Sequence, residues 1–175
     1  MQAVDLELRR AGVDDAPALA RTTQIGFESY RAWTPRGWRP PDHRLELRGI
    51  RERLRRDDAW CLIAVAPGGE PAGHVAFLAA TEREPPRAAI PGRAHLWMLF
   101  LRPPWWGTGL ATRLHGLALA EAARRGYETM QLYTPTGQAR ARAFYEREGW
   151  TVDGQPFAEP MLDLELVRYL RRLGA

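Results

Sequence analysis

The sequence predicts a single mixed α/β domain over residues 1–175. The chain has 175 residues, a common size for one domain, and a chain of this length buries about 70% of its unfolded surface. Short apolar segments with strand character alternate with longer segments in which apolar residues have helical spacing. No repeat, linker or low-complexity tract divides the chain. Its 45% hydrophobic and 26% charged residues are typical of a globular protein.

Composition and the N-terminal sequence argue against several classes of protein. No apolar run approaches the roughly 20 residues of a membrane span. Acidic residues and an Arg pair interrupt MQAVDLELRRAGVDD, which is unlike a signal peptide. We therefore expect a cytoplasmic protein without a membrane partner. Cys61 is the only cysteine, so an internal disulfide is impossible, and its surroundings WCLIAV favour a buried thiol over a nucleophile.

The net charge of +4 rests on arginine alone, because the chain contains no lysine. This usage suggests codon bias in a GC-rich, bacterial genome. The densest cluster, RGIRERLRR, follows Leu47 and places Ile50 and Leu54 on the same helical face, which favours a solvated helix over a nucleic-acid-binding patch. We expect no nucleic-acid partner and no metal. A mild positive charge does suit an anionic small molecule.

The first third of the chain predicts a strand and two helices. Alternating apolar and polar residues in VDLELRRA indicate a strand over residues 4–11. An Asp then caps a helix that is expected to run to about Tyr30. A second helix is expected over 43–56. Between them lies RAWTPRGWRPPDH, a loop with three prolines and two tryptophans that is too long for a plain connection, and such loops are often functional.

The rest of the chain predicts six strands and two helices. The segment PGGE lies between the first two of these strands, and its turn-forming proline and glycines indicate a hairpin. Leu110, Leu114 and Leu117 form the expected core face of the longer helix, which Gly126 ends. The expected strands cover 60–65, 72–80, 95–101, 129–134, 150–154 and 161–167, and the expected helices cover 109–125 and 138–148.

The stretch PPWWGTGLA joins a strand to a helix and carries two glycines just before the helix. A Walker A loop needs a lysine, which this chain lacks. A dinucleotide fingerprint needs a third glycine where Thr112 stands. Two readings remain open. Either the glycines serve chain geometry alone, or bare N–H groups at the positive end of the helix bind a pyrophosphate.

The segment LFLRPPWWGTGLATRL resembles the signature of the GCN5-related N-acetyltransferases, the GNAT family. In that family a strand is followed by hydrophobic-x-Pro-x-aromatic-Arg/Gln-Gly-x-Gly-x-Gly/Ala and a helix. The residues that match are Leu101, Pro103, Trp105, Gly107, Gly109, Leu110 and Ala111. Trp106 departs from the pattern, because it stands at the usual Arg or Gln position.

A second segment, QARARAFYEREGW, resembles the family's Asn-x-x-Ala-x-x-Phe-Tyr-x-x-x-Gly-aromatic helix. The residues that match are Ala141, Phe144, Tyr145, Gly149 and Trp150, while Gln138 replaces the usual Asn. The order and spacing of the two motifs are also family-like, and the resemblance extends over about residues 4–167. It implies the GNAT fold, with a six- to seven-stranded, mostly antiparallel central sheet and about four helices on both faces.

The resemblance implies that acetyl-CoA is the co-substrate and that its acetyl group passes directly to an amine. The residues that it assigns to acetyl-CoA binding are Leu99, Phe100, Leu101, Trp106, Gly107, Thr108, Gly109, Leu110, Ala111, Thr112, Gln138, Ala141 and Tyr145. Within this set the Leu101 N–H is the expected oxyanion donor. Tyr145 matches the tyrosine that commonly protonates the leaving sulfur.

Relatives often carry a base on the strand that leads into the first motif, and His95 stands at that position. "HLW" here resembles the "HLH" of arylalkylamine acetyltransferases, with Trp97 in place of the second His. An imidazole titrates in the useful range, so we expect His95 to accept the amine proton directly or through water. His74 is a weaker candidate, and ordered water or a loop carboxylate such as Glu82 or Glu84 remains an alternative.

The acceptor site is expected at the loop between the first two helices. Trp33 and Trp38 in this loop, together with Trp97, would form an aromatic wall that suits an arylalkylamine or another amphipathic amine. We therefore expect an N-acetyltransferase that acts on a primary amine of a small molecule or peptide. A non-catalytic acyl-CoA-binding or sensor module is the alternative. The sequence leaves open whether the chain forms a homodimer.

Overall fold

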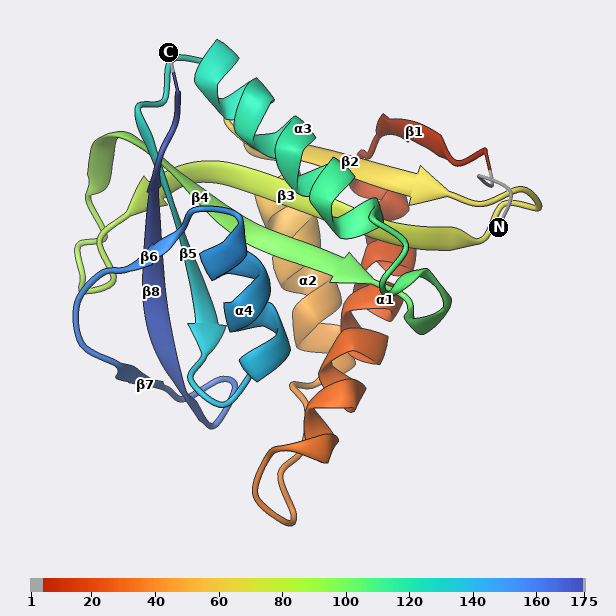
Figure 1. Ribbon diagram of the computed structural model, residues 1–175, viewed down its shortest axis with the longest axis horizontal. Helices are drawn as coiled ribbons and strands as arrows, with labels where there is room; N and C mark the ends of the chain where they lie inside the picture. Colours follow the sequence, from red (N-terminus) through yellow and green to blue (C-terminus); the bar gives the residue numbers. More distant parts are fainter. Residues whose placement is uncertain (1–4, 175) are drawn as a thin grey trace.

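The computed structural model describes residues 5–174, which form eight strands and four α-helices (Figure 1). The strands are β1 (Glu7–Arg10), β2 (Trp60–Val65), β3 (Pro71–Thr81), β4 (Ala89–Leu101), β5 (Thr129–Pro135), β6 (Thr151–Val152), β7 (Phe157–Glu159) and β8 (Leu164–Arg172). The helices are α1 (Ala16–Glu28), α2 (His43–Leu54), α3 (Leu110–Arg124) and α4 (Ala139–Arg147). The expected mixed α/β architecture is confirmed.

All strands belong to one sheet in the order β1-β2-β3-β4-β5-β8-β6, with β7 paired to β8. Every pair is antiparallel except β4 and β5, which run parallel. Helices α1 and α2 cover one face of the sheet, and α3 and α4 cover the other (Figure 1). Each face therefore has its own apolar core, one that includes Leu19 and Ile50 and one that includes Leu114 and Trp150.

Strands β4 and β5 pair only along a short stretch. Arg93, Ala94 and His95 lie opposite 129–131, and beyond His95 the two strands no longer pair. The register of β4 against β3 also shifts within 96–98, which is a β-bulge. A bulge bends a strand and turns the side chains that follow it. The parallel pair therefore opens toward the end of β4, just before the glycine-containing turn.

Several elements differ from the sequence-based expectation. Strand β4 begins at Ala89 rather than at residue 95, and the three-residue β7 was not expected. Leu117 was expected in the core but is 40% exposed, because α3 buries positions spaced by four residues and ends its core face with Ala118 and Ala122. The expected first strand included Val4, which lies outside the described residues.

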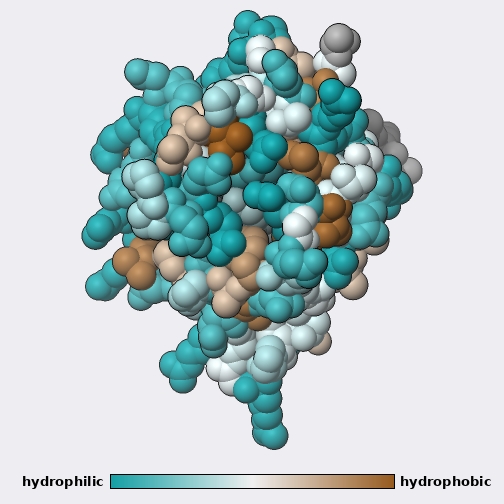
Figure 2. Space-filling view, turned by 90° about the vertical axis from the view of Figure 1, so that its left-hand side faces the viewer, coloured by the Kyte–Doolittle hydropathy of each residue, from teal (hydrophilic) through white to brown (hydrophobic). Residues whose placement is uncertain are grey.

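The face of the molecule over β6, β7 and β8 is mainly hydrophilic, with hydrophobic residues scattered between polar ones (Figure 2). Scattered apolar residues of this kind are normal on a protein surface. Within the described residues, no helix has both the length and the apolar character needed to cross a membrane. The feature that points to function is instead the opening between β4 and β5.

Candidate active site

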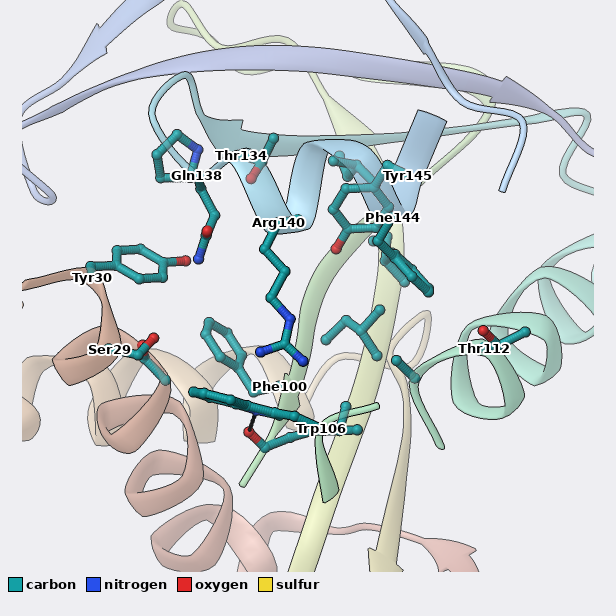
Figure 3. A pocket seen from close by; sticks show the side chains of 18 of the residues that line it. Ser29, Tyr30, Phe100, Trp106, Thr112, Thr134, Gln138, Arg140, Phe144 and Tyr145 are labelled. Carbon is teal, nitrogen blue, oxygen red and sulfur yellow. Dashed lines mark hydrogen bonds between the residues drawn. The ribbon is translucent and has the colours of Figure 1, made fainter. Parts of the chain in front are cut away.

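A cleft of about 750 Å³ lies where β4 and β5 diverge. Its walls come from β4, β5, α4, the glycine-containing turn and the segment that follows α1 (Figure 3). Residues that line it are Gly26, Ser29, Tyr30, Trp33, Leu96, Trp97, Leu99, Phe100, Leu101, Trp106, Gly107, Gly109, Ala111, Thr112, Leu132, Tyr133, Thr134, Pro135, Gln138, Arg140, Ala141, Phe144, Tyr145 and Arg147. Both sequence motifs therefore contribute to one cavity.

The glycine loop, which we define as residues 103–109, begins with a 3-10 turn and ends at Gly109, the N-cap residue of α3. Gly107 and Gly109 have φ values of 74° and 86°, in the left-handed region that favours glycine. The Thr108 hydroxyl donates to the Trp105 carbonyl oxygen at 2.8 Å, which closes the turn. The N-cap residue Gly109 offers no side chain to α3, and the Thr108 hydroxyl accepts a long hydrogen bond of 3.4 Å from the Leu110 N–H.

The loop leaves a row of backbone donors unused. Among the described residues, no hydrogen bond uses the N–H group of Gly107, Thr108, Gly109, Ala111 or Thr112. Gly107 and Gly109 also have open space where a Cβ atom would stand. Free N–H groups and the positive end of a fifteen-residue helix together favour a negatively charged group at this position. This arrangement fits a phosphate group.

Two cofactor-assigned residues of the loop region do not line the cleft. Thr108 holds the turn through its hydroxyl, and Leu110 is buried in the core beneath α3. Trp106 does line the cleft and is 38% exposed. Its indole N–H donates to the Leu101 carbonyl oxygen at 2.9 Å, so the ring is tied to the end of β4 (Figure 3). The guanidinium of Arg140 lies over this ring, 4.6 Å from its centroid.

The end of β4 presents backbone groups to the cleft. The Arg102 N–H donates to the Ala72 carbonyl oxygen at 2.9 Å, on the β3 side of the strand. Successive N–H groups along a strand point to opposite sides, so the Leu101 N–H points away from β3. That is the side from which β5 has diverged. On the other face, the Phe100 ring packs directly against Gly26 of α1, where no Cβ atom would fit.

Tyr145 lies in the second turn of α4, and its hydroxyl points into the cleft (Figure 3). Burial raises the pKa of this phenol above its ordinary value, so it keeps its proton at neutral pH. Gln138 lines the same wall at the N-terminal end of α4. Tyr145 therefore presents a hydrogen-bond donor to whatever occupies the cleft.

His95 is not among the residues that line the cleft, which differs from the expectation of a base at the reacting centre. It lies before the β-bulge, with its ring 5.0 Å from that of Tyr133, and its shielded Nδ1 atom has no hydrogen-bond partner. Burial, followed by the charge of Arg53, lowers its pKa to about 4. The imidazole is thus neutral at pH 7, but it is a weak base and lacks direct contact with the cavity.

The other candidate histidine and the cysteine have structural surroundings. His74 is 1% exposed, its Nε2 atom lies 3.3 Å from the Thr23 hydroxyl, and burial lowers its pKa to about 3. His115 accepts a hydrogen bond from the Trp150 indole at 2.9 Å, and burial lowers its pKa to about 4. Cys61 is buried in the core, which raises its pKa to about 12. None of the three lines the cleft.

The two tryptophans of the α1–α2 segment, residues 29–42, lie in different places. Trp33 lines the cleft and packs closely against Gly137, which follows β5. Trp38 does not line it: the side chain is 6% exposed, and its indole N–H donates to the Leu162 carbonyl oxygen at 2.7 Å. The expected contribution of Trp38 to the acceptor wall is therefore not seen, because this indole joins the segment to the turn before β8.

The aromatic wall also contains residues that sequence reasoning missed. Tyr30 and Tyr133 line the cleft with Trp33 and Trp97. Tyr30 is placed by the end of α1, and Tyr133 by the alternation of side chains along β5. The sequence indicated these two positions only weakly. Among the described residues, no group of three or more His, Cys, Asp or Glu side chains is placed to hold a metal ion.

Comparison with known proteins matches residues 25–150 to the acetyltransferase (GNAT) family. No curated protein sequence matches the chain. Among solved structures, a GNAT-family acetyltransferase from Staphylococcus aureus Mu50 has a TM-score of 0.71 at 12% identity, over 97% of this chain and 100% of that one. PaiA N-acetyltransferase from Thermoplasma acidophilum, solved in complex with coenzyme A, has a TM-score of 0.69 at 15% identity, over 94% and 98%. The ribosomal-protein-S18-alanine N-acetyltransferase from Escherichia coli has 0.67 at 14%, over 98% and 96%.

The structural likenesses are at low identity, so they show a shared fold. The family match is more informative, because its span of residues 25–150 covers more than half of the chain. It contains the glycine loop, α3, and the helix that carries Tyr145. The expected resemblance is confirmed: the chain belongs to the GNAT family of acetyltransferases.

Proposed function

We propose that the protein transfers an acetyl group from acetyl-CoA to a primary amine of a small molecule or peptide. The observation that carries this proposal is the set of N–H groups at Gly107, Thr108, Gly109, Ala111 and Thr112, which have no partner among the described residues and lie where the glycine loop and α3 border the cleft. An anion site of this kind suits the diphosphate of a coenzyme. The coenzyme A that accompanies PaiA N-acetyltransferase of the same fold supports the choice of donor.

The opening between β4 and β5 suits the extended pantetheine arm. A ligand that starts at the glycine loop and follows the end of β4 would bring its thioester toward Tyr145 on α4 (Figure 3). The Leu101 N–H, which points away from β3, is the proposed donor to the oxyanion that forms when the amine attacks the thioester carbonyl. No covalent acyl-enzyme is needed in this reaction.

Tyr145 is the proposed acid for the departing thiolate. The tetrahedral intermediate breaks its carbon–sulfur bond, and the sulfur takes the phenol proton as coenzyme A leaves. The raised pKa keeps that proton in place until then. His95 does not line the cavity and its lowered pKa makes it a weak base, so we propose that water carries the proton away from the amine.

The acceptor end suits an amine on an apolar or aromatic body. Tyr30, Trp33 and Tyr133 supply aromatic rings, which attract an ammonium group and stack on an arene. Trp97 also lines the cleft, but the guanidinium of Arg53 already lies over its ring, 5.5 Å from the centroid. The lining contains no Asp or Glu side chain. A polyamine or aminoglycoside would bring several positive charges into a cleft without countercharges, and we expect both to be poor acceptors.

Release of free thiol from acetyl-CoA across an amine panel tests the proposal. The panel contains phenylethylamine, an N-terminal peptide, spermidine and an aminoglycoside, each corrected for hydrolysis without amine. We expect phenylethylamine or the peptide to give release well above the blank, and the polycations to give little. Binding of acetyl-CoA with no release above the blank for any amine would favour the non-catalytic acyl-CoA-binding alternative.

A further inference from the structure

Arg140 reaches from α4 across the cleft to the glycine loop on the opposite wall. Its guanidinium lies over the face of the Trp106 indole, with 4.6 Å between the guanidinium carbon and the ring centroid (Figure 3). The indole cannot turn freely, because its N–H donates to the Leu101 carbonyl oxygen at 2.9 Å. Trp106 is thus a fixed platform, and a cation over an aromatic face is attracted to it.

The donors of Arg140 are unused. Among the described residues, the contact of this guanidinium is its stacking on Trp106, and no hydrogen bond or salt bridge joins it to an oxygen atom. Stacking occupies only the face of the planar group, so its five N–H donors remain available in the plane. The lining of the cleft contains no carboxylate that would neutralise the charge.

Arg140 lies beside the glycine loop, unlike the other arginine that lines the cleft. Trp106 directly precedes Gly107, the first residue in the row of free backbone N–H groups. Arg147 is the one other charged residue of the cleft lining, and its guanidinium lies over Phe144 of its own helix. Of the two arginines, Arg140 alone stacks on the glycine loop.

We propose that Arg140 binds the diphosphate of acetyl-CoA from the α4 wall, with Trp106 holding the guanidinium in place. The glycine loop donates backbone N–H groups from one side, and the fork of Arg140 donates from the other, in the two-point geometry that suits a phosphate. The inference rests on the proposed function, because it needs a coenzyme in this cleft. It adds a side-chain cation to a site that otherwise consists of backbone groups.

Calorimetric titration of 3′-dephospho-CoA and of pantetheine tests the proposal. Both share the pantetheine arm, but only the first carries a diphosphate, and neither has a 3′-phosphate. For Arg140→Gln we expect 3′-dephospho-CoA to bind about 10-fold more weakly or worse, since charge-assisted hydrogen bonds are lost. Pantetheine should bind as it does to the wild type. Arg140→Lys should fall in between, because lysine keeps the charge without the planar fork.

Two further variants complete the test. Arg147→Gln removes the same charge from the same helix and cleft, and it should weaken binding by less than about 3-fold because it leaves the stacked guanidinium in place. Trp106→Leu should weaken binding of 3′-dephospho-CoA, and combining it with Arg140→Gln should add little, since the two residues act as one unit. Additive losses would contradict that coupling.

Each remaining outcome has a distinct meaning. Unchanged affinity in Arg140→Gln, or an equal loss in Arg147→Gln, would overturn the inference while leaving the donor assignment intact. An equal loss for pantetheine and 3′-dephospho-CoA would also overturn it, because the effect would then not concern the diphosphate. Failure of the wild type to bind any coenzyme A derivative would instead refute the proposed function.

Discussion

Tyr145 and the two tryptophans of the α1–α2 segment show how surroundings decide a residue's task. The Tyr145 side chain is half-buried and its hydroxyl points into the cleft, and its raised pKa suits an acid rather than a base. Trp33 faces the cavity, whereas Trp38 is bonded to the Leu162 carbonyl oxygen and packs in an apolar cluster with Phe27. Matched substitutions can separate these tasks.

Removing the Tyr145 hydroxyl should slow the reaction without preventing coenzyme binding. Tyr145→Phe keeps the ring that packs against Trp150 and Tyr169. We expect kcat to fall by about 100-fold, a typical contribution of one general acid, while the dissociation constant of acetyl-CoA stays within about 2-fold. Steady-state kinetics and calorimetry check this. An unchanged kcat at saturating acceptor would remove Tyr145 from the mechanism.

Trp33→Ala and Trp38→Ala should behave differently. Trp33→Ala should raise the acceptor KM and leave acetyl-CoA affinity nearly unchanged, because this ring lines the acceptor end. Trp38→Ala deletes a buried indole and should lower the free energy of unfolding by about 3–5 kcal/mol. Denaturant unfolding and kinetics distinguish the two. A stability loss for Trp33→Ala as large as that for Trp38→Ala would show that both rings are structural.

At the residue scale, the two sequence motifs identified the glycines and Tyr145, and these residues do line one cleft. Their roles remain predictions. It could not place His95, because the β-bulge at 96–98 changes which face of β4 each later side chain occupies. Arg140 was missed for another reason. Its significance lies in the stacking on Trp106, and that contact joins residues 34 positions apart, which no local pattern reveals.

The glycine loop and α3 act as one element in the account of coenzyme binding. The left-handed conformation at Gly109 lets the chain enter α3 with its first N–H groups exposed. Gly126 at the other end of the helix has almost the same conformation, with φ of 88° against 86°. At both positions a Cβ atom would meet no protein atom within 4 Å.

These two glycines form a matched pair for a test of the element. Alanine at either position carries the same backbone strain, about 1–2 kcal/mol. Only at Gly109 does the new methyl group stand beside the proposed diphosphate. We expect acetyl-CoA to raise the melting temperature of Gly126→Ala as it does for the wild type, and to raise that of Gly109→Ala much less. Equal shifts in the two variants would contradict the assignment.

At the element scale, the boundaries of strands and helices were predictable where apolar periodicity is strong, as in β2 (Trp60–Val65), which matches the expected range. The first half of β4 was not predicted, because it contains Pro91 and Gly92, and both residue types are rare inside strands. They are tolerated next to the irregular pairing between β3 and β4 near Ala79. The three residues of β7 are too few for an alternation pattern to appear.

The separation of β4 from β5 is the feature of the whole molecule on which the proposed function depends. It creates the cleft, and it was not predictable from the residues alone, because parallel pairing joins distant segments without a local pattern. The antiparallel character of the rest of the sheet was expected through the family resemblance. The sheet has eight strands in the described residues, against the six or seven expected.

Three histidines with lowered pKa values should make the whole molecule sensitive to mild acid. Burial lowers the pKa of His74 to about 3 and the pKa values of His95 and His115 to about 4, below the ordinary 6.5. Below pH 6.5 the unfolded chain therefore binds protons that the folded chain does not, and stability falls as pH falls. Each group contributes at most about 1.4 kcal/mol per pH unit until its folded pKa is reached. Denaturant unfolding at pH 7 and pH 5 should show this loss, and a smaller one in His74→Gln. Equal stability at both pH values would contradict the buried, neutral state.

The proposed coenzyme site is tested most directly by amide nuclear magnetic resonance of the ¹⁵N-labelled protein during titration with coenzyme A and with pantetheine. The account predicts that coenzyme A shifts the amide signals of the glycine loop and the first turn of α3 and slows their hydrogen exchange, because these N–H groups become donors to the diphosphate. The signals concerned are those of Gly107, Thr108, Gly109, Ala111 and Thr112. Pantetheine should perturb β4 and α4 but leave this row nearly unchanged. Saturable binding of coenzyme A with the row unperturbed, or with its main effects outside the cleft, would contradict the account.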